Sequence, residues 1–150
     1  MHLINQENII KLLEVYETTN SIYMVLELLQ GGNLVDHLKK NIKLSEKESS
    51  IMIRSILRAL EHMHSKKIMH RDIKPENILF KKNCDPKIVE DNIVIVDFGL
   101  AALKQENNYL FARCGTPGFV APEIINLKNH QEKYDVVCDL FSVGVILHIL

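Results

Sequence analysis

The stretch IMHRDIKPENILF, residues 68–80, places two basic residues, an acid and an amide within seven positions, between two short apolar runs. A strand that follows a tight polar loop lets the loop side chains converge on one point while the strand anchors them in the core. Asp72 can then act as a base or as a metal ligand, and Asn77 offers a neutral oxygen. The spacing of Asp72, Lys74 and Asn77 therefore predicts a polar site on a buried support.

A second carboxylate follows the apolar run IVIV, residues 93–96. Asp97 ends this run, and the next residues are Phe98 and Gly99, where a glycine permits an abrupt change of chain direction. Two carboxylates, an amide oxygen and a lysine suit Mg²⁺, which takes few protein oxygens and shares its other positions with water and phosphate. Phosphoryl transfer is the hypothesis that follows. Each element alone could be a surface ion pair, a turn or a loop cap, so only their agreement in order and spacing favours function.

Composition limits the other classes of function. The chain has 150 residues, of which 47% are hydrophobic and 25% charged, as in an ordinary globular domain with a real core. The formal net charge is −1 and the lysines are scattered along the chain, so nucleic acid is not an expected partner.

Cysteine usage and hydropathy favour a reducing compartment. Cys84, Cys114 and Cys138 show no CxxC spacing, so neither a disulfide framework nor a zinc site is predicted. The N-terminus carries acids and amides where a signal peptide has an apolar core. The apolar run 136–150 is interrupted by Asp139 and is shorter than the roughly 20 residues that cross a bilayer, so it predicts a buried core helix. We therefore expect a cytoplasmic protein with no membrane partner.

Local patterns predict the principal elements. Residues 9–17 and 22–28 suit a β-hairpin, and Asn33 can cap a short helix over 34–40. Ser45 with Glu48 forms a capping box for a helix over 46–64. One face of that helix carries Ile53, Ile56, Leu57, Leu60 and Met63. Residues 78–80 and 93–96 predict two short strands, and residues 97–123 predict a long loop of the kind that is usually functional.

Five motifs, in order, resemble those of a eukaryotic serine/threonine protein kinase. HRDIKPEN (70–77) is similar to the catalytic loop, and DFG (97–99) is similar to the metal-binding motif. GTPGFVAPE (115–123) is similar to the end of the activation segment. YMVLELLQGGNL (23–34) is similar to the hinge between lobes, and DLFSVGVIL (139–147) is similar to the central helix of the large lobe. Lys74 and the GTP at 115–117 resemble serine/threonine rather than tyrosine kinases. CGTPGFVAPEI looks most like the calcium/calmodulin-dependent group, which implies calmodulin as a possible regulatory partner.

The resemblance implies a role for each catalytic-loop position. Asp72 would accept or orient the hydroxyl of a protein substrate, and Lys74 would neutralise charge on the transferring phosphoryl group. Asn77 and Asp97 would hold the Mg²⁺ ions that bridge the phosphates of ATP. The protein would contribute placement and fixed charge.

Further positions follow from the same resemblance. Glu27 and Leu29 would offer the backbone carbonyl and amide that bind adenine, with Leu79 packing beneath the base. His70 and Phe98 would stack in the regulatory spine, a role that coincides with ordinary core packing.

Three positions of the resemblance concern the peptide substrate and the activation segment. Glu76 would face basic residues of a peptide substrate, although a solvated acid explains it equally well. Thr116 would bond near the catalytic aspartate. Glu123 would pair with an arginine that these 150 residues do not supply.

The implied fold is α+β, a partial kinase-like domain. Residues 1–28 would be a remnant hairpin of the small lobe, 29–33 the hinge, and 34–150 the first, mainly helical, part of the large lobe, truncated in its central helix. The glycine-rich GxGxxG loop, the β3 lysine and the helix-C glutamate of the family are absent from the sequence. We expect a fragment that is marginally stable and inactive in isolation.

One departure concerns control, and two other interpretations stay open. Arg71 usually accompanies control by activation-loop phosphorylation, yet Ala112 stands where many relatives carry the phosphorylated threonine. The chain could be a truncated kinase-like regulator without catalysis. A small-molecule phosphotransferase also uses an Asp with an Asn five residues later, but Arg71, the Lys74-Pro75-Glu76 run and the APE at 121–123 argue against it.

Overall fold

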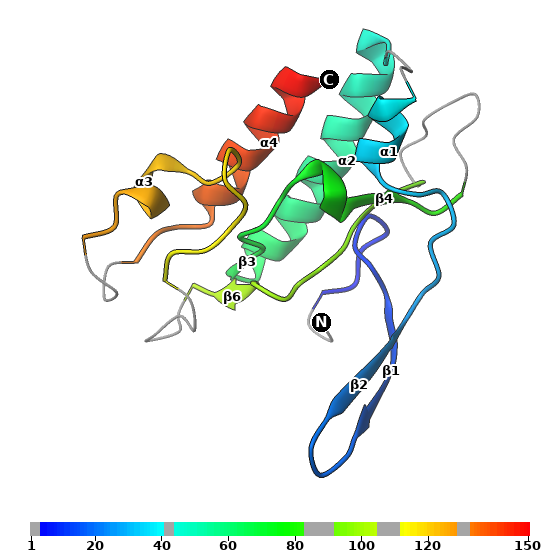
Figure 1. The fold of residues 1–150 in the computed structure, drawn as a ribbon, viewed down its shortest axis with the longest axis vertical. Coiled ribbons are helices and arrows are strands. Elements are labelled where there is room, and N and C mark those ends of the chain that lie inside the picture. The colour runs from blue at the N-terminus through cyan, green and yellow to red at the C-terminus, as the bar shows by residue number, and fades with distance from the viewer. Residues whose placement is uncertain (1–3, 41–43, 83–91, 105–111, 129–132) are drawn as a thin grey trace.

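The computed structural model describes residues 4–40, 44–82, 92–104, 112–128 and 133–150. The N-terminal part is the predicted hairpin, in which β1 (Leu12–Glu17) pairs antiparallel with β2 (Ile22–Leu26) and Tyr16 faces Tyr23. The hairpin extends away from the rest of the chain (Figure 1), and every side chain of β2 is exposed. Nothing among the described residues covers either face of this two-stranded sheet, so its stability depends on the ladder and the turn alone.

The segment after the hairpin runs back along the core. Gln30 donates a backbone hydrogen bond to Lys81, and Gly31 donates one to Phe80. A side chain at Gly31 would lie 2.4 Å from the Lys82 carbonyl oxygen, so the close approach requires glycine. Helix α1 (Leu34–Lys39) then begins as predicted, with Asn33 accepting a 2.8 Å hydrogen bond from the Asp36 amide.

Helix α2 (Glu46–Ser65) is the longest element and has the predicted capping box. The Ser45 hydroxyl accepts from the Glu48 amide, and the Glu48 carboxylate accepts from the Ser45 amide. Ile56, Leu60 and Met63 are buried, as the apolar face predicted. Leu57 departs from the prediction because it is 41% exposed. Its side chain lines an open groove together with Leu140 and Leu147.

Two small antiparallel ladders hold the stretch 68–80. β3 (Ile68–Met69) pairs with β6 (Ala102–Leu103), and β4 (Ile78–Phe80) pairs with β5 (Ile93–Ile95). The 3₁₀ turn η1 (Pro75–Asn77) leads directly into β4. Residues 70–77 therefore leave one ladder and enter the other, and both ends of this loop are anchored in buried strands.

The C-terminal part contains α3 (Pro122–Ile125) and α4 (Val137–Ile149). The prediction of a loop over 97–123 was therefore partly wrong, since β6 and the start of α3 lie inside it. The prediction of a buried core helix at the C-terminus was also wrong in part. One side of α4 is buried, but Leu140, Phe141, Leu147 and Ile149 are exposed because only α2 packs closely against the helix among the described elements.

Two clusters of buried side chains form the core. The larger joins α2, β4, β5 and α4, and the smaller lies around Met69, Ala121 and Tyr134. Cys114 and Cys138 carry free thiols, and Cys84 lies outside the described residues. No helix in the described ranges is long and apolar enough to cross a membrane. The α+β class is confirmed: helices α2 and α4 lie side by side, with β3 and β6 near one end of α2 (Figure 1), and β5 packs against α2.

Candidate active site

The carboxylate of Asp139, on α4, holds the start of the loop 70–77 in place. Asp139 accepts hydrogen bonds from the His70 amide at 3.0 Å and from the Arg71 amide at 2.8 Å, and the His64 Nε2 donates to it at 2.8 Å. Its side chain is only 1% exposed, so these bonds satisfy a charge that is otherwise costly to bury. Arg71 has a φ of 68°, a conformation that a non-glycine residue keeps only when neighbours hold it.

Asp139 is the principal residue that the sequence did not assign to the site. It appeared there only as an interruption of an apolar run. An acid inside an apolar helix is itself a signal, because such a group must find buried donors. Those donors lie 68 and 69 residues earlier in the chain, which no local pattern indicates.

His70 is fully buried and is held in one tautomer. Its Nε2 donates to the Val96 carbonyl oxygen at 2.9 Å, and its Nδ1 accepts from the Asp72 amide at 3.3 Å. This pattern requires a neutral ring with its proton on Nε2. Burial lowers the pKa of His70, and this effect outweighs the opposite influence of the nearby Asp139 carboxylate. The ring also contacts Phe98, with centroids 4.9 Å apart.

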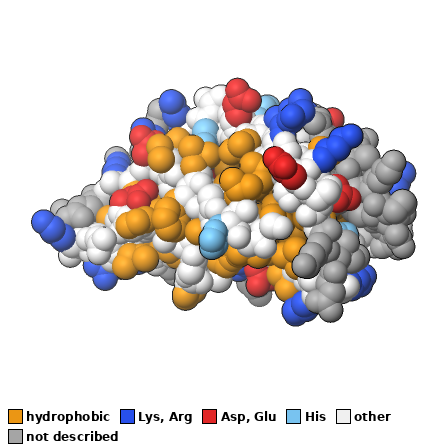
Figure 2. Space-filling model, turned by 90° about the horizontal axis from the view of Figure 1, so that it is seen from above, with side chains coloured by type: hydrophobic (Ala, Val, Ile, Leu, Met, Phe, Trp, Pro, Cys, Tyr) orange, Lys and Arg blue, Asp and Glu red, His pale blue; other side chains and the backbone are white. Residues whose placement is uncertain are grey.

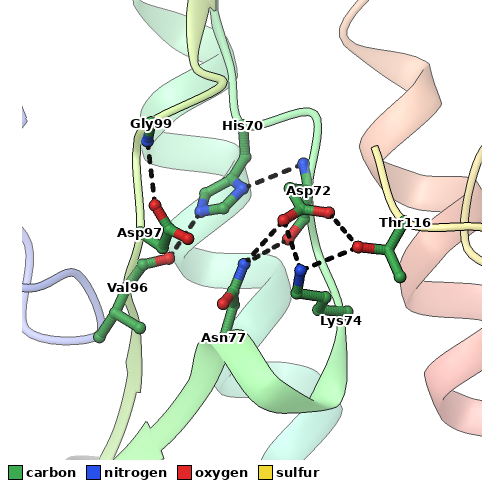
Figure 3. Close-up of polar contacts among 8 residues, drawn as sticks. All are labelled: His70, Asp72, Lys74, Asn77, Val96, Asp97, Gly99 and Thr116. Carbon is green, nitrogen blue, oxygen red and sulfur yellow. Dashed lines mark hydrogen bonds and ion pairs between the residues drawn. The ribbon is translucent and has the colours of Figure 1, made fainter. Parts of the chain in front are cut away.

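The Asp72 carboxylate is the centre of the polar cluster in Figure 3. It accepts from Lys74 Nζ at 2.7 Å and from Thr116 Oγ1 at 2.7 Å, and Lys74 Nζ also donates to Thr116 Oγ1 at 2.8 Å. The three side chains therefore form a closed triangle. Burial raises the pKa of Asp72, but the hydrogen bonds from Lys74 and Thr116 outweigh it and hold that pKa below its ordinary value. Asp72 is thus ionised and oriented near neutral pH.

Thr116 reaches this triangle because its segment packs directly on the loop. Gly115 has a φ of 113°, and a side chain there would lie 2.9 Å from the Arg71 carbonyl oxygen. Ser142 of α4 donates to the Phe119 carbonyl at 2.7 Å and holds the other end of the segment. The contact brings together residues that are 44 positions apart in sequence.

Asn77 and Asp97 present oxygens on two different elements. The Asn77 amide nitrogen donates to the Asp72 carbonyl at 2.9 Å, so its Oδ1 is the atom directed elsewhere. Asp97 is exposed, has a φ of 62°, and accepts from the Gly99 amide at 3.2 Å. Figure 3 shows it on the opposite side of the His70 ring from Asp72.

This donor set fits a magnesium ion that phosphate helps to hold. An amide oxygen and a carboxylate are hard oxygen ligands of the type that Mg²⁺ prefers. Within the described ranges no group of three or more His, Cys, Asp or Glu side chains is arranged to hold a metal. Mg²⁺ bound by two protein oxygens would therefore need phosphate and water as its other ligands.

The other positions named from the sequence lie apart from this cluster. Leu79 is half-buried on β4 and pairs with Val94, and a bridge to Asn33 brings the segment after the hairpin beside it. Glu27 exchanges backbone and side-chain bonds with Lys11 at the base of the hairpin, and Leu29 is half-buried.

Two acids remain at the surface. Glu76 and Glu123 are exposed, and neither has a side-chain hydrogen bond or an ion pair within the described ranges.

Comparison with known proteins gives a single family. The family model of the protein kinase domain matches residues 1–150. The serine/threonine-protein kinase DCLK3 of Mus musculus is 45% identical over 147 residues, which are 98% of this chain and 18% of that protein. Calcium-dependent protein kinase 5 of Plasmodium falciparum is 44% identical over 150 residues, 100% of this chain and 25% of that protein.

A crustacean relative shows the same pattern. Calcium/calmodulin-dependent protein kinase type 1 of Macrobrachium nipponense is 38% identical over 143 residues, 95% of this chain and 39% of that protein. The chain thus spans less than half the length of each of these three relatives. The motifs, the partial α+β fold and the family match agree: the chain belongs to the protein kinase family, and its relatives include serine/threonine kinases of the calcium-dependent and calcium/calmodulin-dependent types.

Proposed function

We propose that this chain carries the catalytic loop of a serine/threonine protein kinase that transfers the γ-phosphate of ATP to a hydroxyl of a protein. The observation that carries the proposal is the closed triangle of Asp72, Lys74 and Thr116 beside Asn77. It joins an ionised acceptor directly to a positive charge, and Asn77, which offers an oxygen ligand, donates to the same acceptor through its amide nitrogen. In-line phosphoryl transfer uses groups of these three kinds.

Each residue then has a definite task. Asp72 orients the attacking hydroxyl and accepts its proton, and its lowered pKa keeps it ionised at neutral pH. Lys74 is tied to Asp72 in this structure and is placed to meet negative charge when phosphate enters. Asn77 Oδ1 and the Asp97 carboxylate would hold Mg²⁺, which supplies charge neutralisation between the phosphates. Thr116 bonds to both Asp72 and Lys74 and so holds the two side chains at a fixed separation.

The nucleotide would lie along the segment that follows the hairpin. Glu27 and Leu29 would present backbone groups to adenine, and Leu79 would pack beneath the base. The support for this placement is the backbone contact of residues 30–32 with β4, which brings the segment beside Leu79. Since two of the reported relatives are named as calcium-dependent or calcium/calmodulin-dependent kinases, calcium-linked control, including a calmodulin partner, belongs to the same proposal.

The test uses the native protein, purified with any residues that its gene encodes on either side of these 150. We expect it to phosphorylate Ser/Thr peptides with ATP and Mg²⁺. Asp72→Asn should lower kcat by at least about 100-fold, because general-base groups contribute 10²–10⁴. Asp36→Asn is the matched control, since Asp36 is an exposed carboxylate on α1 outside the cluster. An Asp72→Asn variant with wild-type kcat would contradict the proposal.

A regulator without catalysis is the second candidate. We propose that the 150-residue polypeptide by itself transfers no phosphate. Binding of ATP by the native protein without any Asp72-dependent transfer would favour this candidate, whereas transfer by the isolated polypeptide would overturn the expectation of inactivity.

A further inference from the structure

The side chain of Arg71 is bound by a tyrosine from a distant segment. Arg71 Nε donates to the Leu100 carbonyl at 2.6 Å, and its Nη1 donates to the Tyr134 hydroxyl at 2.9 Å. Both side chains are buried, with 6% of each residue exposed. A buried guanidinium needs such acceptors, and a bond to a charged donor contributes more than one between neutral groups.

The Tyr134 hydroxyl also faces the segment that carries Thr116. Its oxygen lies 3.8 Å from Cys114 Sγ, within hydrogen-bond distance for sulfur. Because the Tyr134 oxygen accepts from Arg71, its own proton is available to that sulfur. Burial raises the pKa of Tyr134 well above its ordinary value, so the hydroxyl stays protonated in any assay near neutral pH.

Tyr134 therefore touches both parts of the chain that meet at Asp72. Arg71 precedes Asp72 directly, and Cys114 lies two residues before Thr116. Gly115 packs against the Arg71 carbonyl, so a shift of Arg71 would also move the Thr116 segment. Residue 112 is an alanine, so this position offers no hydroxyl.

We propose that Tyr134 is a positioning residue for phosphoryl transfer. Its hydroxyl holds Arg71 and the 112–118 segment together so that Thr116 meets Asp72. The proposal rests on the proposed function. Tyr134 acts through Arg71.

The first experiment is kinetic, on the native protein. Tyr134→Phe removes only the hydroxyl and should lower kcat about tenfold, since losing a bond to a charged group changes the free energy by more than 1 kcal/mol. The KM for ATP should change less than twofold. Tyr16→Phe, which removes an exposed hydroxyl from β1, is the matched control and should leave kcat unchanged. An unchanged kcat in Tyr134→Phe overturns the proposal.

A double-mutant cycle separates positioning from a merely structural role. If Tyr134 acts through Arg71, then Tyr134→Phe has no further effect on kcat in an Arg71→Met background. Independent effects that multiply would overturn the proposal. If Tyr134→Phe alone folds poorly, Arg71→Met can still be compared with the double variant. The double variant removes the Arg71 charge together with the Tyr134 hydroxyl, so it leaves no buried charge without its partner.

Hydrogen exchange gives a readout that needs no activity. Tyr134→Phe should accelerate amide exchange in peptides covering 68–74 and 112–121 and should leave α2 unchanged. If the wild-type protein transfers no phosphate, the proposed function fails, and this experiment alone decides whether Tyr134 joins the two segments. Equal exchange in the two proteins overturns the inference.

Discussion

Thr116 shows how much a single hydroxyl contributes to the site. It donates to Asp72 and accepts from Lys74, so it keeps two oppositely charged groups at fixed places. Thr116→Val keeps the shape and removes both bonds. We expect kcat to fall about tenfold or more, whereas Thr116→Ser should stay within a few-fold of wild type. Steady-state kinetics with a Ser/Thr peptide check this, and equal kcat in the Val and Ser variants would contradict it.

Because His70 is buried, the free energy of unfolding of the chain depends on pH. The unfolded state takes up a proton near pH 6.5, but burial lowers the pKa of His70 in the folded state. Below about pH 6.5 the unfolded state therefore binds more protons, and the free energy of unfolding falls as the pH drops towards the folded-state pKa. The slope for one such group is at most about 1.4 kcal/mol per pH unit.

Urea denaturation at pH 7.5, 6.5 and 5.5 measures this slope. The His70→Gln variant should lose part of the acid destabilisation that the wild-type chain shows between pH 6.5 and 5.5. His148→Gln, at an exposed position of α4, is the control and should keep it. Identical slopes for wild type and His70→Gln would show that the buried ring does not control acid stability.

At the residue scale, the sequence identified the side chains that act over short spacings. Asp72, Lys74 and Asn77 lie within one turn-rich loop, so their convergence could be predicted from local pattern. Asp139 and Tyr134 could not be found in this way. Asp139 meets the His70 amide 69 positions away, and Tyr134 meets Arg71 63 positions away, so only the folded chain shows which buried donor meets which acceptor.

At the scale of elements, local chemistry decided what could be predicted. The start of α2 is set by Ser45 and Glu48, which are three residues apart, and the structure begins the helix there. The burial of α4 depends instead on which elements pack around it. Its apolar composition was compatible with a buried helix, but the described elements cover only one side.

Two glycines in different elements make a matched test of packing. A side chain at Gly31 would lie 2.4 Å from the Lys82 carbonyl and 2.5 Å from Phe80 Cβ, so the segment after the hairpin would have to move. Gly31→Ala should lower the free energy of unfolding by about 1–3 kcal/mol. Gly144 lies inside α4, and its added side chain would meet nothing within 4 Å. Gly144→Ala should therefore raise stability by up to about 1 kcal/mol.

Urea denaturation of both variants compares these effects in one experiment. Opposite shifts of the unfolding midpoint are expected. A stable Gly31→Ala variant would mean that the contact with β4 is not close in solution. A destabilised Gly144→Ala variant would mean that another group occupies that face of α4.

At the scale of the whole molecule, apolar side chains are concentrated on two uncovered surfaces. One is the hairpin, where Ile22 and Tyr23 are 67% and 59% exposed. The other is a groove of about 810 Å³ between α2 and α4, lined in part by Leu57, Leu140 and Leu147. The face seen in Figure 2 shows orange side chains gathered across much of its width. Patches of this extent usually contact another surface in soluble proteins.

The 150 residues expressed as a separate polypeptide should therefore self-associate, because water is excluded when such surfaces meet. Sedimentation velocity over a concentration series should show species larger than 17.3 kDa at high concentration. The Leu140→Lys/Leu147→Lys variant should shift the distribution towards monomer by placing charges in the groove. Ile125→Lys, which charges an exposed position on α3 outside the groove, is the control and should shift it less. A polypeptide that stays monomeric throughout the series would contradict this prediction. It would show that the two apolar surfaces remain in contact with water and do not drive self-association.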